Sequence, residues 1–323
     1  MAALAFVLLG LGALAHPAAG QQADPGLPDL AERLTGMTAV TGFEQQLVDS
    51  LVRLLPGAAR DRAGNAVVSL GNGERQRLVA CPVSEPGFVV GRVREDGWLT
   101  LRRAPGRAAP LSERQLEGQR ITVFGRRGPV PGVVAVRSIH LTRGRGTPGE
   151  TSFTVDSAYA DLGASSAAEV SAAGVGVPDP LAIAKRPQRY GAGLLAAPVA
   201  GRRSACAALL LAARRAIAEP GMVPRGERVV VAFVVEQELG GRGLATVAAT
   251  RGPFVETVVA DGGAGEPGAV RQSPDTSVGR PALGRVTRWS LGTRYSGTAV
   301  ETVSLADADS LRAALSRWIR GAR

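Results

Sequence analysis

The sequence predicts an α/β fold in which a mixed, mostly parallel sheet lies between helices and carries an inserted, small β-barrel-like domain. Apolar, strand-like runs alternate with helical patterns up to residue 85 and again from residue 152, as expected for a largely parallel sheet covered on both faces. Between them, residues 86–151 contain short β-like runs broken by Gly and Pro and no long helical pattern. We therefore expect a discontinuous α/β domain, 25–85 and 152–323, with an inserted β-domain at 86–151.

The individual elements follow from apolar periodicity and from turn residues at their ends. Expected helices are 30–55, with Gly42 opening its second half, 165–170, 204–218, 243–249 and 307–319. Expected strands are 66–70, 78–81, 88–90, 98–101, 120–124, 130–136, 228–235 and 254–260, the last of which ends at Asp261. Residues 262–291 are rich in Gly, Pro, Ser and Arg, and we expect them to be the least structured part.

The composition indicates a globular protein that does not bind nucleic acid specifically. Hydrophobic residues make up 45% of the 323 residues, enough for a sizeable core. The formal net charge is +10, but Lys185 is the sole lysine and the arginines are scattered along the chain. No zinc-finger spacing, basic helix or strand with interleaved aromatics accompanies them, so the charge indicates at most weak attraction to anionic surfaces.

The N-terminus is typical of a signal peptide, which we place at 1–20. The chain is apolar up to Ala15, too short a run for a comfortable membrane span, and its first charged residue is Asp24. A mis-assigned start or an uncleaved anchor is the alternative, because no Lys or Arg precedes the apolar run. We expect an exported protein, periplasmic or extracellular, with no integral membrane span once the signal is removed.

Two cysteines, Cys81 and Cys206, are compatible with an exported protein. The sequence does not show whether they pair. We expect two small buried thiols, since unpaired cysteine is among the most buried residue types.

The most informative motif is a buried strand that runs into Gln237-Glu238 and a tight turn. Strand 228–235 leads in, and three glycines within 240–243 follow at the spacing of a strand-to-helix turn. Other motifs accompany it along the chain, in the order Thr41–Glu44, Asp61–Asn65, Glu85–Phe88, Glu95–Leu99, Asp156–Gly174 and Arg294–Glu301.

Taken in order, these motifs resemble the glutamyl aminopeptidase family of di-zinc metallopeptidases, also called TET-like or endoglucanase M-like. The resemblance extends from about Leu30 to Ile319 and implies the same α/β fold with its inserted domain. It also implies two zinc ions, each with a histidine ligand, a bridging aspartate, and a glutamate that acts as general base on metal-bound water. Family members assemble through dimers into large hollow particles, so the resemblance implies an oligomer as well.

Most functional positions that the resemblance implies carry other residues in this chain. In chain order these positions fall on Pro82, Ser84, Gly201, Gln237, Glu238, Asp261 and Gly297. The two histidines and the bridging aspartate thus fall on proline and glycine, which have no ligand atom in the side chain. The general base falls on Gln237, whose amide cannot take a proton from water. Glu238 and Asp261 keep the family's metal-binding carboxylates.

The rest of the chain offers few replacement ligands. The two histidines are His16, in the presumed signal, and His140, in the inserted domain. A one-residue slip would bring Cys81 to the first histidine position, and a single metal held by Cys81, Glu238 and Asp261 is chemically possible. We expect no bound cofactor, with zinc as the metal if any is retained.

The sequence thus predicts a catalytically inactive, exported relative of the di-zinc aminopeptidases. It would act as a binding or assembly component, with a peptide or protein partner and in a homo- or hetero-oligomer. The alternative is a metal-dependent aminopeptidase that releases N-terminal residues from peptides at an atypical or single-metal site. The chain between Asp261 and Arg294 is also short for the family, which leaves residues 273–276 as the remnant of a segment that shapes the substrate pocket.

Overall fold

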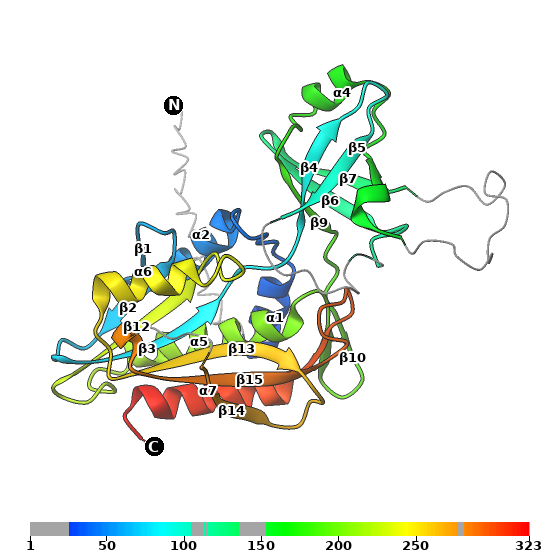
Figure 1. The fold of residues 1–323 in the computed structure, drawn as a ribbon. Helices are drawn as coiled ribbons and strands as arrows, with labels where there is room; N and C mark the ends of the chain where they lie inside the picture. The colour runs from blue at the N-terminus through cyan, green and yellow to red at the C-terminus, as the bar shows by residue number, and fades with distance from the viewer. Residues whose placement is uncertain (1–25, 105–112, 114, 136–152, 277–280, 323) are drawn as a thin grey trace, which may run out of the picture.

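The computed structural model of this protein describes residues 26–104, 113, 115–135, 153–276 and 281–322. The described chain forms two parts, an α/β domain built around one large sheet and a closed β-barrel beside it (Figure 1). This architecture confirms the fold class predicted from the sequence. The presumed signal at 1–20 and both histidines, His16 and His140, lie outside the described residues.

The large sheet is mixed, with parallel strands at its centre. Its strands are β1 (Ala59–Arg60), β2 (Ala66–Leu70), β3 (Arg75–Pro82), β10 (Gln188–Tyr190), β11 (Leu194–Ala196), β12 (Glu227–Val234), β13 (Glu256–Ala264), β14 (Val270–Pro274), β15 (Arg285–Arg294) and β16 (Thr302–Ser304). They follow the order β1-β2-β12-β3-β13-β15-β16-β11-β10, and β14 pairs with β15. Because β12, β3 and β13 are parallel neighbours, their carboxyl ends meet at one edge, where ligands of open α/β sheets commonly bind.

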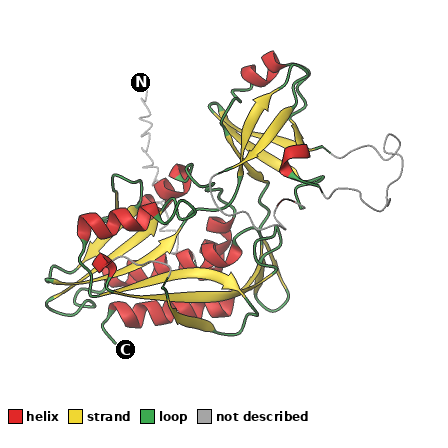
Figure 2. Cartoon of the chain, viewed as in Figure 1, coloured by secondary structure: helices red, strands yellow, loops and turns green. Residues whose placement is uncertain are grey.

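Helices cover both faces of this sheet (Figure 2). They are α1 (Leu27–Thr35), α2 (Gln45–Leu54), α5 (Ala200–Ala218), α6 (Arg242–Arg251) and α7 (Leu305–Ile319), with a short 3-10 turn at Pro281–Leu283. The side chains of β3 alternate between two cores: Val79 and Cys81 pack with α1, α2, α5 and α7, whereas Leu78 and Ala80 pack with α6. In the described residues, no helix combines the length and the apolar character needed to cross a membrane.

The second part is a six-stranded antiparallel barrel with a core of its own. Its strands are β4 (Phe88–Val93), β5 (Leu99–Arg103), β6 (Arg120–Gly125), β7 (Gly128–Val134), β8 (Tyr159–Asp161) and β9 (Pro180–Ile183), accompanied by a 3-10 turn at Val155–Ser157 and by α4 (Ala167–Ala172). They close in the order β4-β5-β8-β7-β6-β9. Val90, Leu99, Val123 and Leu181 are among the residues that fill it.

The predicted end of the inserted domain, residue 151, is too early. β8 and β9 complete the barrel, and Val170 of α4 packs into the barrel core. The prediction failed because two very short strands flank a helix, and that alternation is also expected of the α/β domain. Only the pairing of β8 with β5 and β7, and of β9 with β4 and β6, assigns the segment to the barrel.

Residues 262–291 are more regular than predicted. Their described part contains the end of β13, all of β14 and the beginning of β15. Pro274 ends β14, which pairs with β15 alone, and proline is tolerated on such an edge strand because no donor is required on its outer side. The content of Gly and Pro therefore marked an edge strand and its turns rather than irregular chain.

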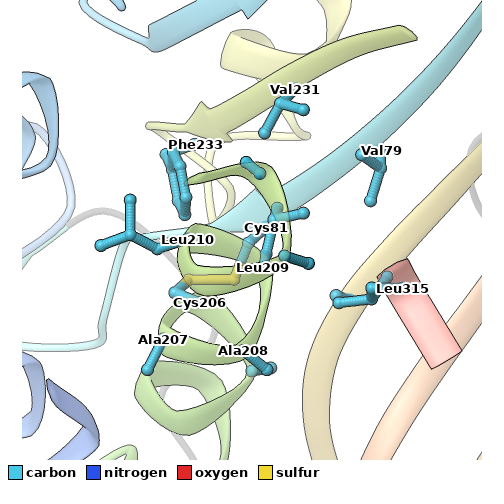
Figure 3. Packing of buried hydrophobic residues seen from close by; sticks show 14 of the residues in the cluster. Val79, Cys81, Cys206, Ala207, Ala208, Leu209, Leu210, Val231, Phe233 and Leu315 are labelled. Carbon is cyan, nitrogen blue, oxygen red and sulfur yellow. A yellow bond between two sulfur atoms is a disulfide. The ribbon is translucent and has the colours of Figure 1, made fainter. Parts of the chain in front are cut away.

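Cys81 and Cys206 form a disulfide that joins β3 to α5 inside the main core (Figure 3). Their Cα atoms are 5.5 Å apart, although 125 residues separate them in the sequence. The expectation of two separate thiols is therefore wrong. Periodicity could place Cys81 on a strand and Cys206 on a helix, but it could not show that the two faces meet. Since the sulfur of Cys81 is bonded to that of Cys206, Cys81 is not a free thiolate that could bind zinc.

Candidate functional site

The loop at 235–241 connects β12 to α6, and Asn65 fixes both of its ends. Asn65 Oδ1 accepts a hydrogen bond from the backbone N–H of Val235 at 2.9 Å, and Asn65 Nδ2 donates to the carbonyl of Gly243 at 3.0 Å. Asp61 orients the amide by accepting from Asn65 Nδ2 at 2.7 Å. Gly243 is required here, since a Cβ atom would lie 2.4 Å from Asn65 Oδ1. The turn at 61–65 therefore positions the loop that carries Gln237 and Glu238.

Glu44 and Ser84 hold the beginning of the same loop. Glu44 Oε1 accepts hydrogen bonds from Ser84 Oγ at 2.7 Å and from the backbone N–H of Glu236 at 2.9 Å. Ser84 Oγ in turn accepts from the backbone N–H of Gln237 at 3.0 Å. Ser84 stands where the resemblance implies a ligand-orienting aspartate, and here it orients backbone. The carboxylate of Glu236 pairs with Arg242 at 3.3 Å.

The guanidinium of Arg202 bridges the carboxylates of Glu238 and Asp261. Arg202 Nε donates to Asp261 Oδ1 at 2.9 Å, and Nη1 donates to Glu238 Oε1 at 3.1 Å. Nη1 also donates to the carbonyl of Ser84. Burial by itself lowers the pKa of Arg202, but the charges and hydrogen bonds of Asp261 and Glu238 outweigh it and raise the pKa, so the guanidinium remains charged.

A second arginine holds the other side of Asp261. Arg288 Nη1 donates to Asp261 Oδ2 at 2.8 Å, and Arg288 Nη2 donates to Asp275 Oδ2 at 2.7 Å. The side chain of Asp261 is 4% exposed, so it is a buried carboxylate between two cations. Asp275 belongs to the segment 273–276, which we interpreted from the sequence as the remnant of a segment that shapes the substrate pocket. The structure brings that segment into the same network.

Glu301 binds the two glycines at which the resemblance implies the bridging aspartate and the last histidine. The backbone N–H of Gly201 donates to Glu301 Oε1 at 3.0 Å, and that of Gly297 donates to Oε2 at 3.0 Å. Burial raises the pKa of Glu301 above its ordinary value, against the opposing effect of these hydrogen bonds. Gly297 has a φ of 75°, in the left-handed region that favours glycine. Backbone amides and one carboxylate thus fill this side of the site.

The residues around Glu238 and Asp261 do not fit a metal ion. Nowhere in the described chain are three His, Cys, Asp or Glu side chains grouped so that they could hold one. Zinc in proteins is bound by at least three protein ligands, which the two carboxylates cannot provide. Pro82, at the buried end of β3, has no ligand atom, and Cys81 is in the disulfide. The positive guanidinium of Arg202 already lies against both carboxylates.

The side-chain oxygen of Gln237 makes no hydrogen bond to the other described polar groups of the site. Its Oε1 is buried without a hydrogen-bond partner among the described residues, and it lies near Gly241, where a Cβ atom would be 3.8 Å away. The side chain therefore turns back over the glycine turn of the loop. Of the residues at 236–238, Glu238 is the one that lines the cavity described below.

A buried ion cluster lies beside the site. Lys185 Nζ pairs with Glu85 Oε2 and donates to the carbonyl of Met37 at 2.8 Å. Arg203 Nη2 also pairs with Glu85 Oε2, at 2.8 Å. Burial lowers the pKa of Lys185 to about 8, although Glu85 opposes this change. Burial by itself raises the pKa of Glu85, but Lys185 and Arg203 outweigh it and keep that pKa low, so Glu85 is ionised.

A cavity of about 250 Å³ lies between the α/β domain and the barrel, and the side chain of Arg202 forms part of its lining. Its polar lining includes Arg202, Glu238, Asp261 and Glu301. Its apolar lining comes from both parts of the molecule and includes Pro86, Phe88, Ile183, Pro198 and Val199. Gln115, which precedes β6 of the barrel, closes one side by donating to the carbonyl of Gly297 at 3.3 Å. Such a mixture of apolar walls and a few convergent polar groups is typical of a ligand pocket.

The sequence identified Glu238, Asp261 and the closing motif with Glu301, but it missed Arg202 and Arg288. The adjacent arginines at 202–203 were among the arginines that the sequence shows scattered along the chain. The available signal was their place, since they open a strongly apolar helix and Arg202 directly follows the position of the implied bridging aspartate. A charge there must either reach solvent or find a carboxylate. No comparable signal marks Arg288, whose partners are set by the pairing of β13, β14 and β15.

Comparisons with known proteins identify the family and the fold of this chain. Residues 64–280 match the model of the M42 glutamyl aminopeptidase family. The protein SgcX from Escherichia coli (strain K12) is 27% identical over 179 residues, 53% of this chain and 46% of that protein. The matched segment therefore spans about half the length of that relative.

Two solved structures share the fold over nearly the whole chain. The TET1 peptidase of Pyrococcus horikoshii, which can assemble into a tetrahedron or a large octahedral shell, has a TM-score of 0.79 and 19% identity, covering 91% of this chain and 99% of that one. The aminopeptidase APDkam598 from Desulfurococcus kamchatkensis has a TM-score of 0.77 and 18% identity, covering 92% and 95%. The fold and the carboxylate edge of the sheet define an aminopeptidase-type α/β protein with an inserted barrel. The chain belongs to the M42 glutamyl aminopeptidase family.

Proposed function

We propose that this M42 family member is a non-catalytic binding protein that is exported from the cell. The observation that carries the proposal is the position of Arg202, whose guanidinium binds both Glu238 and Asp261. In an M42 enzyme these two carboxylates would bind metal, as the sequence motifs imply. With an arginine on them, and Gln237 in place of the general base, the described residues around the cavity offer neither a site for the metal nor a group to activate water.

The cavity above Arg202 supports a binding role. Its apolar walls come from both the barrel and the α/β domain, and its polar groups are already paired with one another. A peptide or a protein segment is the ligand class that suits an M42 fold with these features. Binding would then rest on the cavity's shape, its apolar walls and the Glu238 carboxylate that lines it, without a reaction.

Export is supported by two observations. The first is the apolar run up to Ala15. The second is the buried disulfide between Cys81 and Cys206, because disulfides persist mainly in oxidising compartments such as the periplasm or the cell exterior.

Assembly into homo- or hetero-oligomers is the further part of the proposal. It is supported by family membership, and native mass measurement of the protein, alone and mixed with an active M42 enzyme, tests it.

The decisive experiment measures metal content and peptide release in parallel. The purified protein is incubated with zinc or cobalt, desalted, analysed for bound metal, and assayed for release of N-terminal residues from short peptides. We expect no stoichiometric metal and no release, whereas the TET1 peptidase of Pyrococcus horikoshii serves as the positive control. Gln237→Glu should remain inactive, since it restores the base without restoring ligands. Turnover in that single variant would overturn the proposal.

Binding is tested separately with a variant that fills the cavity. Ala299 lines the cavity, so Ala299→Trp should abolish the thermal stabilisation that binding tripeptides produce in the natural protein. The matched control is Ala306→Trp, at an exposed position of α7. If both variants respond to peptides like the natural protein, the ligand does not occupy this cavity.

A metal-dependent aminopeptidase with an atypical or single-metal site is the second candidate. Membership of the M42 family favours it, as does the presence of Glu238 and Asp261 at one edge of the sheet. It requires Arg202 to move away from both carboxylates when metal enters. It predicts near-stoichiometric zinc or cobalt and peptide release that a chelator and Glu238→Gln both abolish.

A further inference from the structure

The cluster around Arg202 forms a continuous chain of alternating charges. In order it consists of Glu238, Arg202, Asp261, Arg288 and Asp275, and we call it the carboxylate–arginine chain. The shortest hydrogen bonds of its three links around Asp261 and Asp275 measure 2.7 to 2.9 Å, and the link to Glu238 measures 3.1 Å. All five side chains are at least three-quarters buried.

Buried carboxylates need a cation close by. Two like charges held together in a site of low dielectric repel each other, and unpaired burial of either is strongly unfavourable. In metalloenzymes the metal supplies the compensating charge. Here the described residues near Glu238 and Asp261 provide it from the polypeptide, because Arg202 contacts both carboxylates at once.

Arg202 is placed for this task by the backbone. It lies in the first turn of α5, one turn before Cys206, which the disulfide anchors to the end of β3. Gly201 is anchored to Glu301, so the residue next in line is held between the carboxyl ends of β12 and β13. The planar fork of arginine can then meet two carboxylates and the Ser84 carbonyl in one arrangement, which the single ammonium of lysine cannot reproduce.

We propose that the Arg202 guanidinium is the resident cation of this site, a covalently attached substitute that balances Glu238 and Asp261 and keeps the floor of the cavity in its shape without metal. The inference deepens the proposed function, since it rests on the site being free of metal in the folded protein. It assigns a positioning role to Arg202: the side chain orders the carboxylates that the cavity presents. When Arg202 is replaced by alanine, the space left by its side chain should accept a free guanidinium ion.

The test combines removal of the cation with its replacement from solution. Arg202→Ala leaves two facing carboxylates without their shared partner, and we expect Tm to fall by roughly 5–15 °C. Methylguanidinium chloride, added at millimolar concentrations, should recover a large part of that loss, whereas sodium chloride at equal ionic strength should not. Arg312→Ala is the matched control, because Arg312 pairs with Asp309 on the outer face of α7 and its loss should give neither a comparable fall nor a rescue.

A charge-removal variant provides an independent readout. Glu238→Gln in the Arg202→Ala background should raise Tm above that of Arg202→Ala alone, because it removes one of the two facing negative charges, the one that Arg288 does not compensate. A residue that only fills space would not show this coupling. If Arg202→Ala does not fold, the same cycle built on Arg202→Lys gives the coupling between position 202 and Glu238.

The outcomes separate this inference from the proposed function. A Tm unchanged in Arg202→Ala, or a fall that neither methylguanidinium nor Glu238→Gln relieves, overturns the resident cation even if the natural protein binds no metal. Stoichiometric zinc in the natural protein overturns the proposed function. If the natural protein binds no metal, and if both methylguanidinium and Glu238→Gln raise the Tm of Arg202→Ala, the resident cation and the proposed function are both supported.

Discussion

A Cβ atom on Gly201 would lie 2.3 Å from Cγ2 of Thr293, well inside van der Waals contact. Gly201 is where the resemblance implies the metal-bridging aspartate, so the packing of α5 against β15 leaves no room for that residue. We expect Gly201→Ala to lower the free energy of unfolding by about 1–3 kcal/mol, the usual cost of overpacking a core. Urea unfolding monitored by circular dichroism measures this difference.

The cause of that loss can be isolated in the same chain. Thr293→Ser removes Cγ2, so the double variant Gly201→Ala/Thr293→Ser should be more stable than Gly201→Ala alone. Gly176→Ala is the control, because a Cβ atom at Gly176 would have no heavy atom within 4 Å. Equal losses for Gly201→Ala and Gly176→Ala would contradict the steric explanation.

The disulfide between Cys81 and Cys206 should contribute strongly to stability. It closes a chain segment across a sequence separation of 125 residues inside the main core. Cross-links of this kind stabilise chiefly by restricting the unfolded chain, so we expect Cys81→Ser/Cys206→Ser to cost about 2–5 kcal/mol. Unfolding of the natural protein with and without a thiol reductant should reproduce the difference. A double variant as stable as the natural protein would show that the bond is not formed in solution.

Much of the fold could be predicted from local pattern. The runs that became β12, β13, α5 and α7 are long and strongly apolar or amphipathic, so their type and place followed from periodicity. The end of the barrel could not be predicted, because β8 and β9 are short and are defined by strand pairing alone. The disulfide could not be predicted for the same reason, since its formation depends on which faces of β3 and α5 meet.

The candidate site, like the fold, could be predicted only in part from the sequence. Glu238 and Asp261 could be identified because they keep carboxylates at positions that the family resemblance implies, after or within long buried strands that periodicity predicts. The role of Arg202 could not, because a side chain's partner in space is not written in its sequence neighbours. Its pairing depends on the convergence of α5, the loop after β12 and β13, three elements from distant parts of the chain.

Lys185 predicts a rise of stability in alkaline solution. Burial lowers its pKa from the ordinary 10.5 to about 8 in the folded protein. Below about pH 8 both folded and unfolded chains hold the proton, so the cost of burying the charge is constant. Between about 8 and 10.5 the folded chain has released the proton and the unfolded chain has not, so the free energy of unfolding rises with pH, by up to about 3 kcal/mol.

The measurement compares the natural protein with Lys185→Met by urea unfolding across that range. Because Lys185 is the sole lysine of the chain, the difference between the two curves isolates its titration from that of other groups. The variant should lack the rise. Two curves that stay parallel from pH 7 to pH 10 would show that the Lys185 ammonium is not destabilised by burial.

Glu301 predicts a change of the opposite sign in acid solution. Burial raises its pKa above the ordinary 4.5, while Gly297 and Gly201 donate to its two oxygens. Below 4.5 the carboxyl is protonated in both states, and its contribution to stability is fully present. As pH rises further, the unfolded chain ionises first, so the free energy of unfolding falls until the folded carboxyl ionises as well.

Glu301→Gln cannot titrate and should lack this fall, so its stability relative to the natural protein should increase from about pH 4.5 towards neutrality. The exposed Glu266→Gln is the control for loss of a carboxylate without burial. If the stability of Glu301→Gln runs parallel to that of the natural protein, the pKa of Glu301 is the same in the folded and unfolded chains, and the hydrogen bonds from the two glycine amides cancel the effect of burial.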